Sequence, residues 1–334
     1  MKKFILLLLI LPVSTYLVYG QSSPVPIASP IQVGAYLPGI INPRDYANPE
    51  TSGLIAIDYN VFFSSDQYYD RNGNKTENLD LDLSGYLNAL ALVYVSPEIS
   101  FLGNARYIGF ISPYFATSNY KVGLSELEDP ALNLNGSVSG FGDLGIAPLF
   151  LTWSLGEDKF DLTLGYMFTA PTGRYETGAD DNIGLGYWNH ALQVFTYYYL
   201  MQKATALYLG NTFEFHSKVK DVDVIPGSRY TIEYGVSQYL SERLEVTLQG
   251  GNTWQVGEDS GDDVYWDSSF KDRNSTVGVG LGYWPVTEKL YTNLKWWTNY
   301  GMRQQFKVNA FQLQLIYVPG VLQGKADKNP ELTK

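Results

Sequence analysis

The 334-residue sequence contains no cysteine, which excludes a disulfide scaffold and a lipid-anchoring cysteine. Beyond the N-terminus it lacks any run approaching the roughly 18 apolar residues that indicate a membrane-spanning helix. Basic residues are also scarce, with 23 lysines and arginines against 34 acids and a formal net charge of −11. Because nucleic-acid binding needs basic patches, we expect no nucleic-acid partner.

The N-terminal 20 residues predict a cleaved signal peptide. Lys2 and Lys3 precede an apolar core, 4–11, and Gly20 is small enough to precede a cleavage site. The alternative is a retained membrane anchor, but this core is shorter than the about 20 residues that a spanning helix needs. We therefore expect an exported protein.

Aromatic residues and glycine are abundant, with 27 Tyr, 16 Phe, 7 Trp and 32 Gly. Much of the sequence also alternates between apolar and polar residues with the two-residue period of a β-strand. In 228–240, for example, Tyr230, Ile232 and Tyr234 alternate with arginine, threonine and glutamate. The clearest such segments are 54–63, 160–169, 228–240, 244–256, 275–283 and 311–317.

Loop lengths distinguish a membrane barrel from a soluble sandwich, which also alternates. About twelve strand candidates are joined by connections that are short and long in turn, as in single-chain membrane barrels. The short connections lie near 96–104, 155–159, 200–203, 240–243 and 285–289. The long ones lie near 64–78, 116–141, 171–186, 217–227 and 257–273.

This pattern predicts an all-β fold: a transmembrane antiparallel up-and-down β-barrel of about twelve strands, located in the outer membrane. A closed sheet satisfies every backbone hydrogen bond in lipid. Short turns then face the periplasm, long loops face the exterior, and both termini are expected on the periplasmic side. Residues 21–50 are a proline-rich lead-in that is periplasmic or lumen-facing, 51–318 form the barrel and 319–334 form a polar tail. Tryptophans near strand ends predict an aromatic girdle: Trp188, Trp254, Trp284 and Trp297.

Three motifs suggest other functions, and each has a simpler reading. GFGDLG at 140–145 matches a dinucleotide fingerprint, but the flanking residues are strand-like and no helix is expected after it. The two histidines, His190 and His216, have no evident serine partner, so an enzyme is the less favoured reading. The acidic stretches 178–182 and 257–263 lack EF-hand spacing, which favours solvated loops over calcium sites. We expect no catalytic residue, no metal and no cofactor.

Several short motifs in a shared order resemble the outer-membrane protein family named for the meta-pathway of phenol degradation. They are YLPGIINPRDYANPETSG at 36–53, GFGDL, PTGRY followed by NIGLGYW and ALQ, and PGSRYTIEYGVSQYLSERLEVTLQGGNTWQ. The resemblance covers about 34–318 and implies a barrel that acts as a transporter, linked to aromatic catabolism.

The leading functional hypothesis is a passive channel for small hydrophobic or aromatic compounds, with outer-membrane lipid and the solute as partners. The alternatives are a non-conducting structural or receptor barrel and an outer-membrane enzyme. If the apolar rows face lipid, charged residues of the other rows line the lumen, and Arg229 and Lys295 should pair with acids. The expected lumen residues are Asp58, Asp161, Arg229, Glu233, Glu245 and Lys295. The expected extracellular rim loop begins with Pro171, Thr172, Gly173, Arg174 and Tyr175.

Overall fold

The computed structural model describes residues 29, 34–77, 79–124, 134–179 and 181–319. The expected signal peptide lies outside these residues, as does almost all of the expected C-terminal tail. The described chain is built from strands and one 3-10 turn, Ser100–Leu102. No helix in these ranges is long and apolar enough to cross a membrane.

The strands follow the alternating segments of the sequence closely. The strands of the first half are β1 Gly53–Ser65, β2 Tyr68–Tyr69, β3 Leu79–Ile99, β4 Ala105–Ser112, β5 Tyr114–Leu124, β6 Leu134–Phe141, β7 Leu144–Leu155 and β8 Phe160–Ala170. Those of the second half are β9 Asn189–Leu200, β10 Thr205–His216, β11 Arg229–Tyr239, β12 Leu244–Gln255, β13 Arg273–Val286, β14 Leu290–Arg303, β15 Gln305–Phe306 and β16 Asn309–Tyr317.

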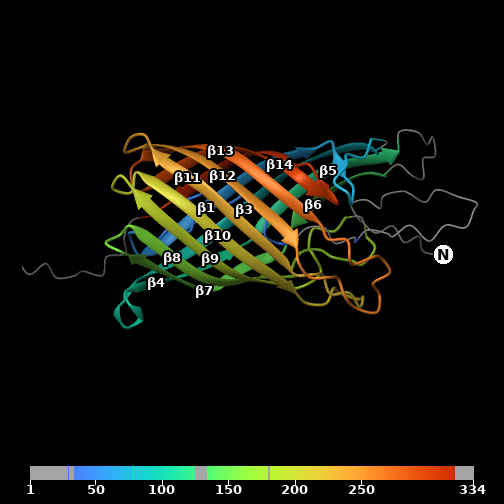
Figure 1. The fold of residues 1–334 in the computed structure, drawn as a ribbon, viewed down its shortest axis with the longest axis horizontal. Coiled ribbons are helices and arrows are strands. Elements are labelled where there is room, and N and C mark those ends of the chain that lie inside the picture. Colours follow the sequence, from blue (N-terminus) through green and yellow to red (C-terminus); the bar gives the residue numbers. More distant parts are fainter. Residues whose placement is uncertain (1–28, 30–33, 78, 125–133, 180, 320–334) are drawn as a thin grey trace, which may run out of the picture.

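These strands form a closed antiparallel barrel whose wall has twelve transmembrane strands (Figure 1). The first and last strands, β1 and β16, pair along nine residues and close the ring. β4 and β5 act as one strand interrupted at Pro113, because both pair with β3. β6 and β7 likewise act as one strand interrupted at 142–143, because β6 pairs with β5 and β7 pairs with β4. The predicted fold class is confirmed.

One expected long loop, 116–141, is largely strand instead. The 21-residue β3 extends beyond the other strands, and its outer half, Leu79–Ala89, pairs with β5. β5 in turn pairs with β6, so the hairpin projects from the extracellular end of the wall (Figure 1). Apart from Phe141, its exposed residues are polar, which concealed the strands from a search for alternating apolar residues.

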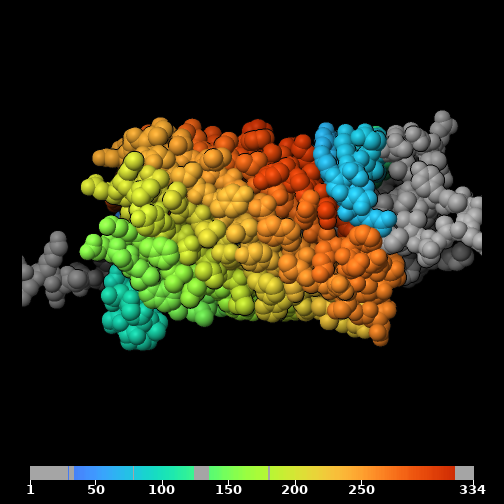
Figure 2. All heavy atoms as spheres, in the orientation of Figure 1, coloured from blue at the N-terminus to red at the C-terminus, as the bar shows by residue number. Residues whose placement is uncertain are grey.

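Three extracellular loops pack together over the same end of the barrel. They are 171–188, 217–228 and 256–272, and they share a small apolar core of Tyr187, Val219, Val224 and Trp266. In Figure 2 the residues near 260 (orange) and those near 70 (blue) gather at this end. We call the three loops the loop cap.

Candidate functional site

The barrel lumen is occupied by residues 34–50, which we call the lumen segment. Its backbone is bonded to wall side chains along its length: Tyr36 N–H donates to Glu214 Oε1 (2.9 Å), Gly39 N–H to Glu233 Oε1 (3.0 Å), and Asn48 N–H to Asp161 Oδ2 (3.0 Å). Glu214 lies at the extracellular end of β10, and Asp161 lies at the periplasmic start of β8. The segment therefore runs through the lumen from the outer end to the inner end.

Ser29, the one described residue before the segment, lies at the extracellular end. The Ser29 hydroxyl donates to the Asp259 carboxylate of the loop cap, and both residues are buried. Residues 21–50 are expected to be periplasmic or lumen-facing; of these, 34–50 lie in the lumen and Ser29 lies at its extracellular end.

One side of the lumen, formed by β11–β16, is polar. Lys295 Nζ donates to the carbonyls of Ile40 (2.9 Å) and Ile41 (3.2 Å), and Gln312 Nε2 also donates to Ile40 (2.8 Å). Gln314 Nε2 donates to Asp45 Oδ1 (2.9 Å). The lumen segment has no regular structure, so its buried backbone N–H and C=O groups do not bond to a neighbouring strand. They need side-chain partners such as these.

A second anchor holds the segment near the periplasmic end. Arg44 Nε lies 3.1 Å from Glu245 Oε1, and its Nη2 donates to the Lys203 carbonyl (2.9 Å). The guanidinium also lies 4.8 Å from the ring centroid of Tyr239. Charged, hydrogen-bonded and aromatic contacts therefore converge on one arginine of the segment.

The opposite side of the lumen is apolar and aromatic. Tyr46 stacks between Phe195 (ring centroids 3.9 Å apart, planes at 4°) and Phe150 (5.7 Å, 13°). Its backbone N–H donates to the hydroxyl of Tyr197 (3.1 Å). This cluster, which we call the aromatic wall, contains Ala91, Val93, Val95, Ile108, Ala147, Phe150, Phe195, Tyr197, Tyr199, Ala206 and Tyr208.

Five of the six expected lumen residues have buried side chains on the inward rows. Asp161, Glu233, Glu245 and Lys295 contact the lumen segment as described above. Arg229 instead makes a bidentate ion pair with Asp272 (2.6 and 2.5 Å), just before β13. Burial raises the pKa of the Asp272 carboxyl, and the Arg229 guanidinium opposes this shift. Lys295 bonds to backbone carbonyls and, within the described residues, makes no ion pair.

Asp58 is on the other row of its strand. Tyr59 and Val61 are buried, and the Tyr59 hydroxyl donates to Asp45 of the lumen segment, so Asp58 points outward. Its carboxylate accepts from Asn88 Nδ2 (2.6 Å) and Asn60 Nδ2 (2.8 Å). In β1 the apolar row faces the lumen segment, so the rule that apolar rows face lipid fails for this strand; in β3 both rows carry apolar residues, and Leu92 and Tyr94 are exposed on the outward face. The two amides partly offset the cost of a charge facing outward.

The expected girdle is present in part. Trp188 and Trp254 are exposed on the outward rows, and Trp284 is half-buried, with its Nε1–H donating to the hydroxyl of Tyr239 (3.0 Å). Trp297 differs from the expectation: it is 6% exposed and points inward, while its neighbour Trp296 points outward. Adjacent residues of a strand alternate, so only one of the two can face lipid.

The expected rim loop is a loop, and an aspartate holds it. Asp143 Oδ1 accepts from Gly173 N–H (2.8 Å) and Oδ2 accepts from Leu185 N–H (2.7 Å). The Thr172 hydroxyl accepts from Leu144 N–H (3.0 Å), and Arg174 is paired with Asp181 (3.2 Å). Pro171 follows the last residue of β8, and Tyr175 packs beside the loop-cap core. GFGDLG thus supplies a loop anchor.

Two further lumen residues are not among the six expected ones. Glu214 binds the segment's first turn, and the alternation of Phe213, Glu214 and Phe215 would have placed it inward. Asp45, in the stretch 36–53, accepts hydrogen bonds from Gln314 and Tyr59. No periodic pattern marks it, since it belongs to no strand.

The histidines and acidic stretches occupy ordinary positions. His190 Nδ1 lies 2.8 Å from the Tyr166 hydroxyl, and His216 Nδ1 lies 3.1 Å from the Pro226 carbonyl. Asp259 accepts from Gly227 N–H (2.7 Å) inside the loop cap. Among the described residues, no three histidine or acidic side chains form a group that could hold a metal ion.

The first of the following solved structures shares this fold. The COG4313 outer membrane channel from Pseudomonas putida F1 aligns over 83% of this chain and 99% of its own, with 20% identity and a TM-score of 0.65. A deltaS2S3 mutant of the monoaromatic hydrocarbon channel TodX aligns over 82% and 91%, with 10% identity and a TM-score of 0.44. No curated protein matches the chain. The family model described as putative MetA-pathway of phenol degradation matches residues 65–315, and the chain belongs to this family.

Proposed function

We propose that this protein is a passive outer-membrane channel for small hydrophobic or aromatic compounds, and not an enzyme. The observation that carries the proposal is the aromatic wall, because a pore for water-soluble solutes is lined by charged and amide groups. Here the side of the lumen formed by β3, β4, β7, β9 and β10 offers rings and aliphatic side chains. The family description, which refers to phenol degradation, supports an aromatic solute.

We infer that such a solute passes through the wall beside β6. The ladder between β7 and β8 ends at Leu144 and Ala170. Beyond it, β6 has no partner on its second edge within the described residues, and Phe141 there is 73% exposed. Inside the break, Phe110 and Met167 pack against the aromatic wall. An apolar solute can therefore move from lipid to the aromatic wall without crossing the polar side of the lumen.

Uptake measurements test the proposal directly. Cells that lack other hydrocarbon channels should accumulate a radiolabelled aromatic hydrocarbon faster when they produce this protein, with no gain for a labelled sugar. Equal accumulation of the hydrocarbon with and without the protein would favour a non-conducting structural or receptor barrel.

A reversible cross-link tests the path through the wall. A side chain at Gly140 would lie 3.6 Å from Ile183 Cγ1, so Gly140→Cys with Ile183→Cys should form a disulfide that ties β6 to the rim loop. The natural chain has no cysteine to interfere. Oxidation should reduce hydrocarbon uptake and reduction should restore it. The control pair, Ile146→Cys with Phe168→Cys, joins strands that are already paired and should leave uptake unchanged. Unchanged uptake in the oxidised Gly140/Ile183 variant would contradict the path and not the channel.

A further inference from the structure

The outward rows of β13 and β14 change character toward the extracellular end. On β14 the outward residues in order are Leu294, Trp296, Thr298, Tyr300 and Arg303. Aromatic residues mark the membrane–water interface, so Arg303 lies just above the lipid-facing band. On β13, Arg273 is the register partner of Arg303, and both are exposed.

Two arginines directly opposite each other on neighbouring strands repel, so the arrangement is unfavourable unless an anion joins it. Among the described residues, no acidic side chain pairs with either arginine. The Arg303 side chain makes no ion pair or hydrogen bond to any described residue, and Arg273 Nε donates only to the Gly301 carbonyl (3.1 Å). This absence stands out in a chain with 34 acids.

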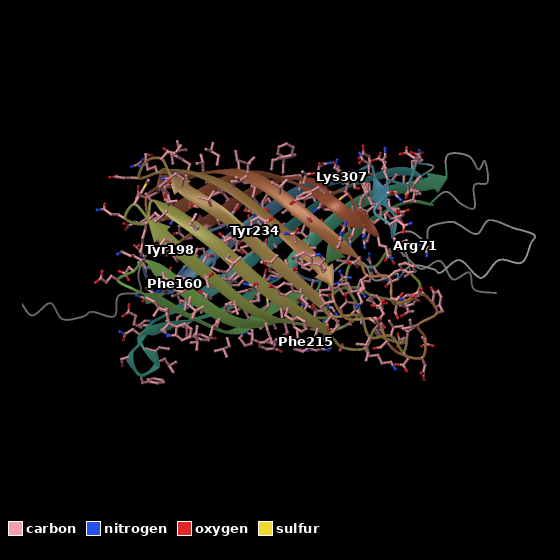
Figure 3. The ribbon with its side chains drawn as sticks, in the orientation of Figure 1. Arg71, Phe160, Tyr198, Phe215, Tyr234 and Lys307 are labelled. Carbon is pink, nitrogen blue, oxygen red and sulfur yellow. The ribbon has the colours of Figure 1, made fainter. Side chains whose placement is uncertain are left out.

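A third cation, Lys307, lines a groove whose lining also includes Gly301 and Met302, the two residues before Arg303. The backbone N–H of Lys307 donates to the Gln67 carbonyl (2.9 Å), which fixes its position, while Nζ has no partner among the described residues. The side chain lies at the outer end of the barrel (Figure 3). The groove has a volume of about 360 Å³ and is lined by Tyr69, Trp296, Thr298, Asn299, Tyr300, Gly301, Met302, Lys307 and Asn309.

We propose that Arg273, Arg303 and Lys307 bind the phosphate groups of an outer-leaflet glycolipid of the lipid A type. Arginine donates two parallel hydrogen bonds to a phosphate, and a lysine adds a compact charge. The acyl chains lie along the outward side chains below, beginning with Trp296 and Phe311, which is 67% exposed. The site binds lipid and not a soluble anion, because its cations continue a lipid-facing row.

The test uses the full-length protein in nanodiscs of phosphatidylcholine containing either bisphosphorylated or dephosphorylated lipid A, with bound lipid counted by native mass spectrometry. The wild type should retain the phosphorylated form in preference. The variant Arg273→Gln/Arg303→Gln/Lys307→Gln should lose about tenfold or more of that preference, because charge-assisted phosphate contacts are removed.

A matched control removes three exposed cations from periplasmic turns: Lys159→Gln/Arg243→Gln/Lys289→Gln. It should bind phosphorylated lipid A like the wild type, which separates the site from net charge. Heat-dependent gel migration reports folding. If Arg273→Gln/Arg303→Gln/Lys307→Gln does not fold, Arg303→Gln and Lys307→Gln are measured singly. Two outcomes would overturn the proposal: equal binding of phosphorylated lipid A by the wild type and by the variants at Arg273, Arg303 and Lys307, or no preference for the phosphorylated lipid in the wild type.

Discussion

Asp143 shows how one side chain organises the rim. It is 1% exposed, and its two oxygens accept the backbone N–H groups of Gly173 and Leu185. A Cβ at Gly184 would lie only 2.7 Å from Asp143 Oδ1, so glycine is required where the loop approaches the carboxylate. The motifs GFGDL, PTG and NIGLG, which are distant in sequence, therefore form one structural unit.

Replacing Asp143 with alanine should loosen the rim loop while leaving the barrel intact. Two part-buried N–H groups lose their acceptor, and because water reaches them the cost is about 1 kcal/mol each, at the low end for an unsatisfied group. Trypsin should then cleave after Arg174 about 10–100-fold faster, because cleavage follows the population of the open loop. Asp143→Asn, which keeps an acceptor oxygen, should give an intermediate rate.

The control for this measurement is Asp181→Asn, which weakens the exposed ion pair of Arg174 itself. An exposed pair contributes about 0–1 kcal/mol, so its loss should change the rate little. If Asp143→Ala and Asp181→Asn are cleaved equally fast, Asp143 does not hold the loop.

Among the elements, the lumen segment has no regular structure and yet the most varied contacts. It bonds through its backbone to Glu214, Glu233 and Lys295, and it inserts Tyr46 into the aromatic wall. A twelve-stranded barrel is wider than the eight-stranded barrels that side chains fill alone. The segment completes the core of this barrel and narrows its lumen.

Replacing residues 36–47 with glycine and serine should open the pore. The linker keeps the chain length but removes Arg44, Asp45 and Tyr46, so ionic conductance in planar bilayers should rise several-fold and thermal stability should fall. The same exchange at 156–159, a periplasmic turn, should change neither quantity. Wild-type conductance in the 36–47 variant would show that the segment does not limit the pore.

Sequence reasoning predicted the strands well because the two-residue period is local. It predicted the inward row correctly where the wall faces polar partners, as for Glu233 and Lys295. It failed at Asp58, because the apolar row of β1 packs against the lumen segment, and that contact is absent from any local pattern. Trp297 was misplaced because it was assigned to the lipid face although it lies two residues after Lys295, on the same inward row.

For the whole molecule, the decisive feature is the seam between the first and last strands. Phe62 and Phe311 are register partners there, and both are exposed on the outward face. Paired positions of neighbouring strands lie close enough for a disulfide, whereas positions two residues apart do not.

The variant Phe62→Cys/Phe311→Cys should therefore oxidise to a closed ring that migrates differently from its reduced form on a denaturing gel. Phe62→Cys/Leu313→Cys, shifted by two residues, should oxidise poorly. The reverse order of yields would mean that the seam has a different register.

The loop cap also decides how the molecule presents itself to its surroundings. Tyr187, Val219, Val224 and Trp266 come from three loops but share one core, so the outermost surface is a folded unit. An antibody or phage protein that binds this surface contacts several loops at once. Its epitope is conformational: peptides copied from the single loops would not reproduce it, and a change in one loop would alter recognition at the other two.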